Sequence, residues 1–358
     1  TTTTTTTTTT PTSCNRAEPF VAGSITQDTT RLNYPPSLGI QKNGSFVFVT
    51  SYFSDCISVI DVVTDPSSPS VIGWLTDATN LNGAYSVRES MDGRYLFVTS
   101  WDGDSIAVVD ASSDPTNPVV VGSLFDSTNM NAPEGLAVSI DGTHAYVAST
   151  LSSSLAIVDC ISDPTTPFVV GSLTGSSNLV DGAKAVVESP DGMRVFVAGW
   201  RDDSVAVVDV TDKSQPVVVG TYQDSTNMNY PTGLVLSPSG EYLYVSCYLS
   251  DAVVVLYVGT NLTTPVLIGA LVDSTNFDGA YGIDVSADGK HVFVSGAVSN
   301  SLAIVDVETD PANPKLVGSI VGDSVHMNTP YAVAVSVDNR FAYVVAQESD
   351  SIAVVSIC

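Results

Sequence analysis

The chain has 358 residues, of which 44% are hydrophobic and 14% are charged, so it contains enough apolar material for a large buried core. Twelve Lys and Arg residues stand against 38 Asp and Glu residues, which gives a formal net charge of −26. A surface this acidic repels phosphate backbones and anionic lipids, which argues against nucleic acid as a partner and against membrane docking. No apolar run in the sequence is long enough to span a bilayer, so we expect no membrane insertion.

The first 13 residues form a low-complexity segment of Thr, Pro and Ser. Such tracts are similar to O-glycosylated stalks and do not form a packed core. Because it begins with ten Thr residues and no Met, we expect a processed or partial chain. We predict a Thr-rich stem or linker over residues 1–13, with O-linked sugars on Thr1, Thr2, Thr3, Thr4, Thr5, Thr6, Thr7, Thr8, Thr9, Thr10, Thr12 and Ser13.

From Phe20 onward the sequence repeats. A short β-branched motif recurs seven times, and the last residues of its copies are 49, 49, 50, 48, 49 and 50 positions apart. A fixed period of this size marks a repeat architecture, and each β-branched run bounded by turn residues is typical of a buried strand. The copies are Ile57–Asp61, Ile106–Asp110, Leu155–Asp159, Val205–Asp209, Val253–Tyr257, Leu302–Asp306 and Ile352–Ser356.

Each repeat contains four predicted strands. The first resembles Gly135–Ser139 and is followed by a hairpin signal such as Asp141-Gly142, which leads to a second strand like Tyr95–Thr99. The β-branched motif is the third strand, and a loop with two prolines separates it from a fourth strand like Val119–Leu124. Four antiparallel strands in each of seven repeats predict an all-β, seven-bladed β-propeller that forms a single domain over residues 14–358.

The ends of the chain indicate how the ring closes. The repeat region starts in a fourth strand and ends in a third strand, so the last blade must borrow its outer strand from the N-terminal part of the chain. Alignment of the repeats places Cys14 and Cys358 at consecutive positions, which predicts a disulfide and an oxidising compartment. The other cysteines, Cys56, Cys160 and Cys247, lie in three different blades without metal-ligand spacing, so we expect buried thiols.

The V-x-V-x-D third strand, the S-x-D-G hairpin and the P-x-x-V-G-S fourth strand resemble the YVTN/LVIVD-type propeller repeats. This resemblance covers Pro19–Cys358. It implies the propeller fold and an extracellular or cell-surface location, but little chemistry, because that family is functionally diverse. Two sequons on predicted turns add N-glycosylation sites at Asn43 and Asn261.

Aromatic residues gather at one predicted end of the propeller. Four of them occupy the turn after the second strand, and three others begin first strands, whose starts lie at the same end. Aromatic rings among carboxylates suit stacking on sugars or contact with a protein partner, and packing between blades is the alternative. The predicted glycan- or partner-binding face consists of Tyr52, Trp101, Trp200, Tyr248, Tyr85, Tyr281 and Tyr331.

Charged residues interrupt the repeat in the first strands, which line the channel of a propeller. They offer an acidic pocket, able to bind a metal, for a hydrolase or lactonase; salt bridges between blades are the simpler interpretation. The sequence shows no nucleophile–base pair, zinc motif or phosphate loop, so we assign no catalytic residue, no metal ligand and no cofactor, although the Asp-Ser-Thr-Asn loops would allow Ca²⁺. The candidate channel residues are Arg88, Glu89, Glu134, Lys184, Glu188 and Asp284.

These observations favour a non-enzymatic extracellular glycoprotein with a structural or adhesive role. The Thr-rich tail at one face and the aromatic face at the other predict head-to-tail assembly into a filament. The expected partners are copies of the same chain, or surface glycans and proteins. The alternative is a propeller hydrolase or lactonase with a carboxylate or metal site in the central channel.

Overall fold

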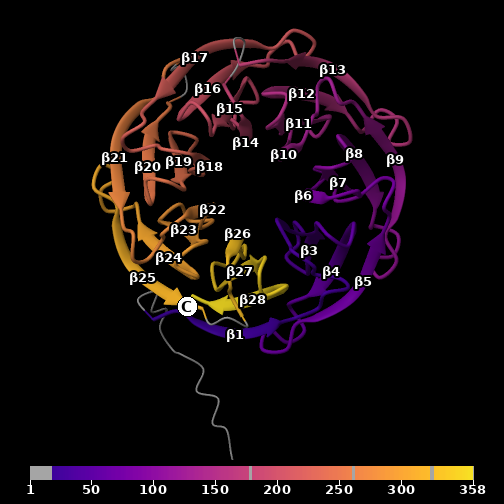
Figure 1. Cartoon of the computed structure of the whole chain (residues 1–358), viewed down its shortest axis with the longest axis horizontal. Coiled ribbons are helices and arrows are strands. Elements are labelled where there is room, and N and C mark those ends of the chain that lie inside the picture. The colour runs from indigo at the N-terminus through magenta and orange to yellow at the C-terminus, as the bar shows by residue number, and fades with distance from the viewer. Residues whose placement is uncertain (1–17, 177–179, 260–262, 323–325, 358) are drawn as a thin grey trace, which may run out of the picture.

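The computed structural model describes residues 18–176, 180–259, 263–322 and 326–357. Its strands form seven four-stranded antiparallel sheets, arranged as blades around a central channel (Figure 1). This arrangement confirms the predicted all-β, seven-bladed propeller. Within the described residues, no helix is long and apolar enough to cross a membrane. Cys14, Cys358, Asn261 and residues 1–13 lie outside the described residues, so the disulfide, the second sequon and the O-glycosylated stem remain predictions.

The first six blades follow the chain in order. Blade 1 contains β2 (Leu38–Ile40), β3 (Phe46–Ser51), β4 (Cys56–Asp61) and β5 (Ser70–Thr76); blade 2 contains β6 (Ala84–Glu89), β7 (Tyr95–Ser100), β8 (Ser105–Asp110) and β9 (Val119–Phe125). Blade 3 contains β10 (Pro133–Val138), β11 (His144–Ser149), β12 (Ser154–Asp159) and β13 (Phe168–Leu173); blade 4 contains β14 (Ala183–Glu188), β15 (Arg194–Gly199), β16 (Ser204–Asp209) and β17 (Val217–Gln223). Blade 5 contains β18 (Pro231–Leu236), β19 (Tyr242–Cys247), β20 (Ala252–Tyr257) and β21 (Val266–Val272); blade 6 contains β22 (Ala280–Val285), β23 (His291–Gly296), β24 (Ser301–Asp306) and β25 (Lys315–Val321).

Blade 7 joins the two ends of the propeller. It contains β26 (Pro330–Val335), β27 (Phe341–Ala346) and β28 (Ser351–Ser356), and its outer strand is β1 (Phe20–Ile25). The indigo β1 lies beside the yellow β28 in Figure 1, and the antiparallel register runs from Phe20 opposite Ser356 to Ile25 opposite Ile352. The predicted borrowing of an N-terminal strand is therefore confirmed.

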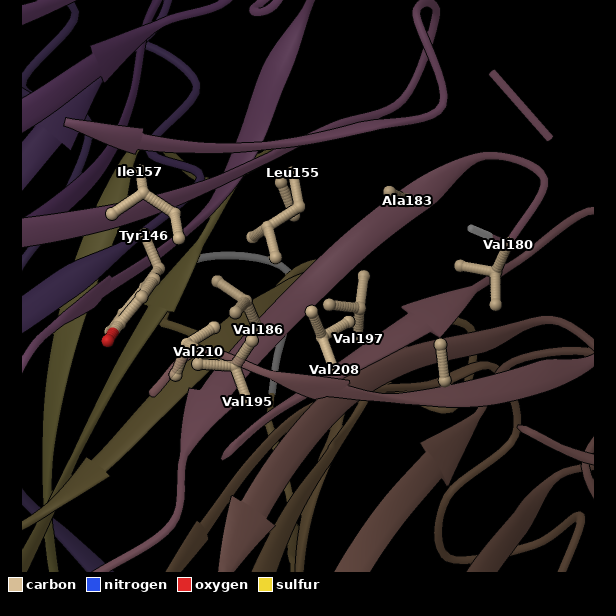
Figure 2. Close-up of a cluster of buried hydrophobic side chains, with 12 residues drawn as sticks. Tyr146, Leu155, Ile157, Val180, Ala183, Val186, Val195, Val197, Val208 and Val210 are labelled. Atoms are coloured by element: carbon tan, nitrogen blue, oxygen red, sulfur yellow. The ribbon is translucent and has the colours of Figure 1, made fainter. Parts of the chain in front are cut away.

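The hydrophobic core lies between neighbouring blades. Figure 2 shows Tyr146, Leu155 and Ile157 of blade 3 packed against residues of blade 4, including Val195 and Val208. A blade has a neighbour on each face, so its middle strands are buried on both sides and read as continuous apolar runs. Full burial of one such valine stabilises the fold by ~1.5–3 kcal/mol. This burial explains why the β-branched motif recurs in every repeat.

A glycine in the fourth strand allows neighbouring blades to approach closely. A Cβ atom added to Gly73 would lie 2.7 Å from the carbonyl oxygen of Pro115, in the loop before the fourth strand of the next blade. The same clash with a backbone carbonyl recurs along the ring, so the glycine of the V-G-S motif is required by packing. The other glycines with this contact are Gly23, Gly122, Gly171, Gly220 and Gly269.

The Asp-Ser-Thr-Asn loops between blades are held by their own side chains. In the first complete example, Oδ1 of Asp77 accepts hydrogen bonds from the backbone N–H groups of Thr79 (3.0 Å) and Asn80 (3.1 Å). The Asn80 side-chain amide donates to the other carboxylate oxygen at 2.7 Å. Asp126, Asp224 and Asp273 repeat the arrangement. This recurrence supports a structural role for the loops; Ca²⁺ at these loops stays a prediction.

Candidate functional site

A ring of hydrogen bonds fixes the loops at one end of the channel, which we call the upper end. The carboxylate of Asp104, in the turn after β7, accepts a hydrogen bond from the backbone N–H of Ala132, just before β10 (3.0 Å). Both residues have positive φ, 46° and 55°, a region that Asp tolerates better than most residues do. The equivalent pairs are Asp55–Gly83, Ser153–Gly182, Asp203–Tyr230, Asp251–Gly279, Asn300–Thr329 and Asp350–Tyr34.

The first strands of all seven blades enclose a cavity of about 140 Å³ just inside the upper end, which we call the upper cavity. A water molecule occupies roughly 30 Å³ in the liquid, so this space suits several waters or one small ring. Its wall carries polar residues that begin the first strands, and its floor is aliphatic. The polar residues are Tyr85, Glu134, Lys184, Thr232, Tyr281 and Tyr331, and the floor contains Leu136, Val186, Leu234, Ile283 and Val333.

A buried ion pair is the main charged feature of the upper cavity. Glu134 Oε2, from blade 3, contacts Lys184 Nζ, from blade 4, and the two side chains are only 10% and 8% exposed. Glu134 also accepts hydrogen bonds from the Tyr85 hydroxyl (3.0 Å), the Thr150 hydroxyl (3.1 Å) and the Trp101 indole N–H (3.4 Å). Four donors therefore stabilise one buried carboxylate, as the desolvation cost of a buried charge requires.

Lys184 keeps its proton in this environment. Burial alone would lower the pKa of Lys184, but the Glu134 carboxylate and the Tyr331 hydroxyl outweigh that effect and hold the pKa above its ordinary value. Its Nζ also lies 5.3 Å from the centre of the Tyr281 ring, within cation–π range. The upper cavity thus contains an ammonium group that donates hydrogen bonds at neutral pH.

Three tyrosine hydroxyls converge beside the ion pair. The Tyr331 hydroxyl donates to that of Tyr281, and the Tyr85 hydroxyl lies 3.4 Å and 3.3 Å from those of Tyr281 and Tyr331. Burial and the Glu134 carboxylate raise the pKa of Tyr85 and Tyr281, while burial and the Tyr281 hydroxyl raise the pKa of Tyr331. All three therefore remain neutral hydroxyl groups, and the Tyr85 hydroxyl donates directly to Glu134.

The structure joins the predicted aromatic residues into a wall around the upper end. Ring centres of Tyr52 and Trp101 are 6.3 Å apart, and those of Tyr248 and Tyr281 are 6.2 Å apart. The rings of Tyr281 and Tyr331 stack at 3.6 Å, and Tyr85 joins them through its hydroxyl. These contacts link the rings to one another; that the residues form a face that binds a glycan or a partner stays a prediction.

The sequence analysis did not identify two further tyrosines of the aromatic wall, Tyr34 and Tyr230. Tyr230 connects Trp200 (4.6 Å between ring centres) to Tyr248 (5.6 Å), and Tyr34 lies 6.4 Å from Tyr52. Tyr34 and Tyr230 have φ of 55° and 61°, at a position where three other blades have glycine and the remaining two have Ala132 and Thr329. A large aromatic residue at this position of the repeat is the signal that identifies them.

The structure distributes the candidate channel residues over two cavities along the channel. Arg88, Glu134 and Lys184 all line the upper cavity. Glu134 and Lys184 lie at its mouth, where they form the expected salt bridge between blades. The remaining four come later in their strands. A strand advances by roughly 3.3 Å per residue, which carries them toward the opposite end of the channel. Arg88, Glu89, Glu188 and Asp284 all line a second cavity there.

The three carboxylates of this second cavity connect neighbouring blades. Glu89 accepts the backbone N–H of Lys42 (2.8 Å), and Glu188 accepts the Tyr146 hydroxyl (2.8 Å). Asp284 accepts the backbone N–H of Val335 at 2.7 Å. Burial raises the pKa of Glu89 and Glu188, and raises that of Asp284 to about 6. No group of three or more His, Cys, Asp or Glu side chains suited to a metal occurs within the described residues.

The remaining predicted positions lie away from the channel. Asn43 is exposed on the β2–β3 turn, where its side chain accepts the Ser45 N–H (2.8 Å), so N-glycosylation there stays a prediction. Cys56, Cys160 and Cys247 are buried free thiols, which confirms that expectation.

The fold and the site define a seven-bladed β-propeller with a buried ion pair and tyrosine hydroxyls at one mouth of its channel. The sequence model of the family "Lactonase, 7-bladed beta-propeller" matches residues 22–265 and 261–358, so the chain belongs to that family. A search of curated proteins gives no match.

Solved structures share the fold at low sequence identity. Hydrazine synthase of Kuenenia stuttgartiensis has a TM-score of 0.73 and 19% identity, with 93% of this chain and 97% of that chain covered. The Cps50 (Swd1) propeller domain of Myceliophteria thermophila has a TM-score of 0.70 and 14% identity, covering 92% and 98%. A putative 6-phosphogluconolactonase of Bacteroides fragilis has a TM-score of 0.68 and 15% identity, covering 83% and 86%. At these identities the likeness shows the fold alone.

Membership of the lactonase family corrects the functional interpretation of the sequence. The expected non-enzymatic, structural or adhesive glycoprotein that forms filaments is wrong, because the family model matching nearly all of the propeller is that of an enzyme family. The alternative, a propeller hydrolase or lactonase, is the better interpretation. The sequence analysis ranked it second because few residues depart from the repeat. In addition, Glu134 and Lys184 form an ion pair only when the fold brings neighbouring blades together.

Proposed function

We propose that the protein hydrolyses a lactone in the upper cavity. The observation that carries this proposal is the buried Glu134–Lys184 pair, which faces a small cavity under three tyrosine hydroxyls in a chain of the lactonase family. Hydrolysis of a cyclic ester needs a base for the attacking water and donors for the oxygen that becomes negative. The upper cavity supplies both kinds of group within one wall.

In the proposed reaction, Glu134 takes a proton from a water molecule while the oxygen of that water attacks the lactone carbonyl carbon. The Lys184 ammonium and the Tyr331 hydroxyl donate hydrogen bonds to the carbonyl oxygen as it becomes an oxyanion. The ring C–O bond then breaks, and the proton on Glu134 passes to the departing ring oxygen, which gives a hydroxy acid. Because the wall is buried, these electrostatic interactions are stronger than those of the same groups in water.

The proposed substrate is a small lactone without a phosphate group. The protein's net charge of −26 repels dianions, and Glu134 already neutralises Lys184. Arg201, on the turn beside Trp200, is similarly occupied by Asp181 at 3.5 Å. This preference separates the proposal from the phosphorylated substrate in the name of the putative 6-phosphogluconolactonase.

We propose that the aromatic wall recruits this substrate by stacking on a sugar-like ring. This use of the wall fits the predicted glycan-binding face. The third-strand and fourth-strand motifs further support a YVTN/LVIVD-type repeat, and an extracellular location remains part of the proposal.

A pH-stat assay tests the proposed activity, since each lactone opened at neutral pH releases one proton. The panel contains unphosphorylated five- and six-membered sugar lactones and simple aliphatic lactones, with reactions in H₂¹⁸O to locate the new oxygen. We expect turnover above the uncatalysed rate, ¹⁸O in the carboxylate, and loss of activity in Glu134→Gln and Lys184→Met. Absence of turnover on the whole panel would reject the proposal, as would unchanged activity in both variants.

A further inference from the structure

The opposite end of the channel contains a second and larger cavity, of about 650 Å³, which we call the lower cavity. All seven first strands contribute to its wall. The wall is mainly aliphatic, with Ile40, Val138, Val187 and Val235 among its residues. Its charged residues are Arg88, Glu89, Glu188 and Asp284. The proposed lactone reaction uses none of these four.

Arg88 departs from the repeat at the position that faces the channel. Five blades have a small or aliphatic residue there, and only blades 2 and 6 carry a charge, Arg88 and Asp284. A feature present in every blade serves the fold, whereas a departure in one blade calls for a separate explanation. The equivalent uncharged residues are Gly39, Ala137, Val187, Val235 and Ala334.

The guanidinium of Arg88 is anchored on one side and open on the other. Its Nη1 donates to the carbonyl oxygens of Val87 (2.7 Å) and Leu38 (3.3 Å), which fixes the group against the wall between blades 1 and 2. The side chain is nevertheless exposed to the channel. Throughout the described residues, no carboxylate lies within ion-pair distance of this guanidinium.

The acidic residues of the lower cavity are unable to neutralise Arg88 directly. Glu89 and Glu188 are held by donors from neighbouring blades, and Asp284 is held by Val335. Enclosure in the channel lowers the pKa of Arg88, and the charge of Asp284 only partly opposes this effect. A guanidinium that faces the channel without a close counter-ion is available to pair with an anion that enters the lower cavity.

We propose that the lower cavity binds a small monocarboxylate with an apolar body, its carboxylate paired with the Arg88 guanidinium. The planar fork of Arg matches a carboxylate with two parallel hydrogen bonds, and the aliphatic wall takes the hydrocarbon part. The three acidic residues repel a dianion such as phosphate more strongly than a monoanion, so they select a single negative charge. This site is independent of the proposed lactonase activity.

Binding of 4-fluorobenzoate, followed by ¹⁹F NMR on the full chain at pH 7.5, tests the proposal. We expect 4-fluorobenzyl alcohol and inorganic phosphate to bind at least about tenfold more weakly, because the alcohol has no charge to pair with Arg88 and the acidic residues repel the phosphate dianion. Arg88→Met should weaken the binding of 4-fluorobenzoate by the same factor. Asp284→Asn should tighten it about threefold or more, since the opposing charge is removed while an oxygen remains for the Val335 N–H.

Two control variants separate the site from general effects. Arg94→Met removes an exposed positive charge from the same blade, and Lys184→Met removes the cation of the upper cavity; both should bind 4-fluorobenzoate as the unaltered chain does. Loss of binding in Lys184→Met with retention in Arg88→Met would overturn the proposal in favour of the upper cavity. Equal affinity for the acid and the alcohol would also overturn it. Should Arg88→Met fail to fold, an unchanged or weaker affinity in Asp284→Asn would overturn it instead.

Discussion

The two partners of the buried ion pair should differ in what their loss costs the fold. Glu134→Gln leaves the Lys184 ammonium buried without an opposite charge, beside the Tyr281 ring and the Tyr331 hydroxyl. Removal of one partner from a buried pair costs ~3–5 kcal/mol because the other charge stays unpaired, and we expect this full range for Glu134→Gln. Lys184→Met leaves the carboxylate with hydrogen bonds from Tyr85, Thr150 and Trp101, so we expect a smaller cost of ~1–3 kcal/mol.

Urea unfolding followed by circular dichroism measures these free energies. The double variant Glu134→Gln/Lys184→Met should cost less than the sum of the single variants, by about 1.5 kcal/mol or more, because no charge is left alone. The exposed pair Lys290–Glu308, with atoms 2.8 Å apart and side chains 44% and 54% exposed, serves as the matched control. The same changes there should cost no more than about 1 kcal/mol. Equal costs for the two single variants at the buried pair, or additivity in the double variant, would refute this reasoning.

Three further changes test other parts of the account. Asp104→Ala should destabilise the protein by ~1–2 kcal/mol in thermal unfolding, because the hydrogen bond to Ala132 is lost and alanine disfavours the positive φ. Asp104→Gly should cost less, because glycine accepts that φ; equal losses for the two variants would contradict the role of φ. Gly73→Ala should cost ~1–3 kcal/mol in the same assay, because its Cβ would meet the Pro115 carbonyl oxygen at 2.7 Å; a neutral effect would argue against the close approach of the blades. The pKa of Asp284 is raised to about 6 from an ordinary 3.8, so the folded state holds this proton more tightly than the unfolded state. The free energy of unfolding should therefore fall as pH rises from about 4 to about 6. Asp284→Asn should flatten this part of the pH profile, and an unchanged slope would reject the assignment.

The fold could be predicted from the sequence because every blade obeys the same packing rule. The β-branched third strand is buried on both faces in all seven blades, so its pattern recurs with a constant period. Closure by β1 also followed from the sequence, since the chain begins and ends within one blade.

The site was only partly predictable. The sequence identified Glu134 and Lys184 as departures from the repeat, but it grouped them with Glu188 and Asp284, as either one acidic pocket or salt bridges between blades. The period fixes which strand a residue occupies, yet the height along the channel decides which residues meet, and a few positions along a strand separate the two ends. The hydrogen-bond donors to Glu134 could not be predicted from the sequence either, because Trp101 and Thr150 come from other strands and turns. Contacts between blades are set by the ring as a whole.

The hydrolysis of an unphosphorylated lactone tests the central claim most directly. The decisive comparison is the initial rate of proton release for Glu134→Gln against Glu308→Gln, two variants with the same change in charge, one in the upper cavity and one on the surface. Loss of a general base lowers a rate by typically 10²–10⁴-fold, so Glu134→Gln should be at least about a hundredfold slower while Glu308→Gln keeps the full rate. Full activity in Glu134→Gln, or no lactone opened by the unaltered chain, would contradict the account.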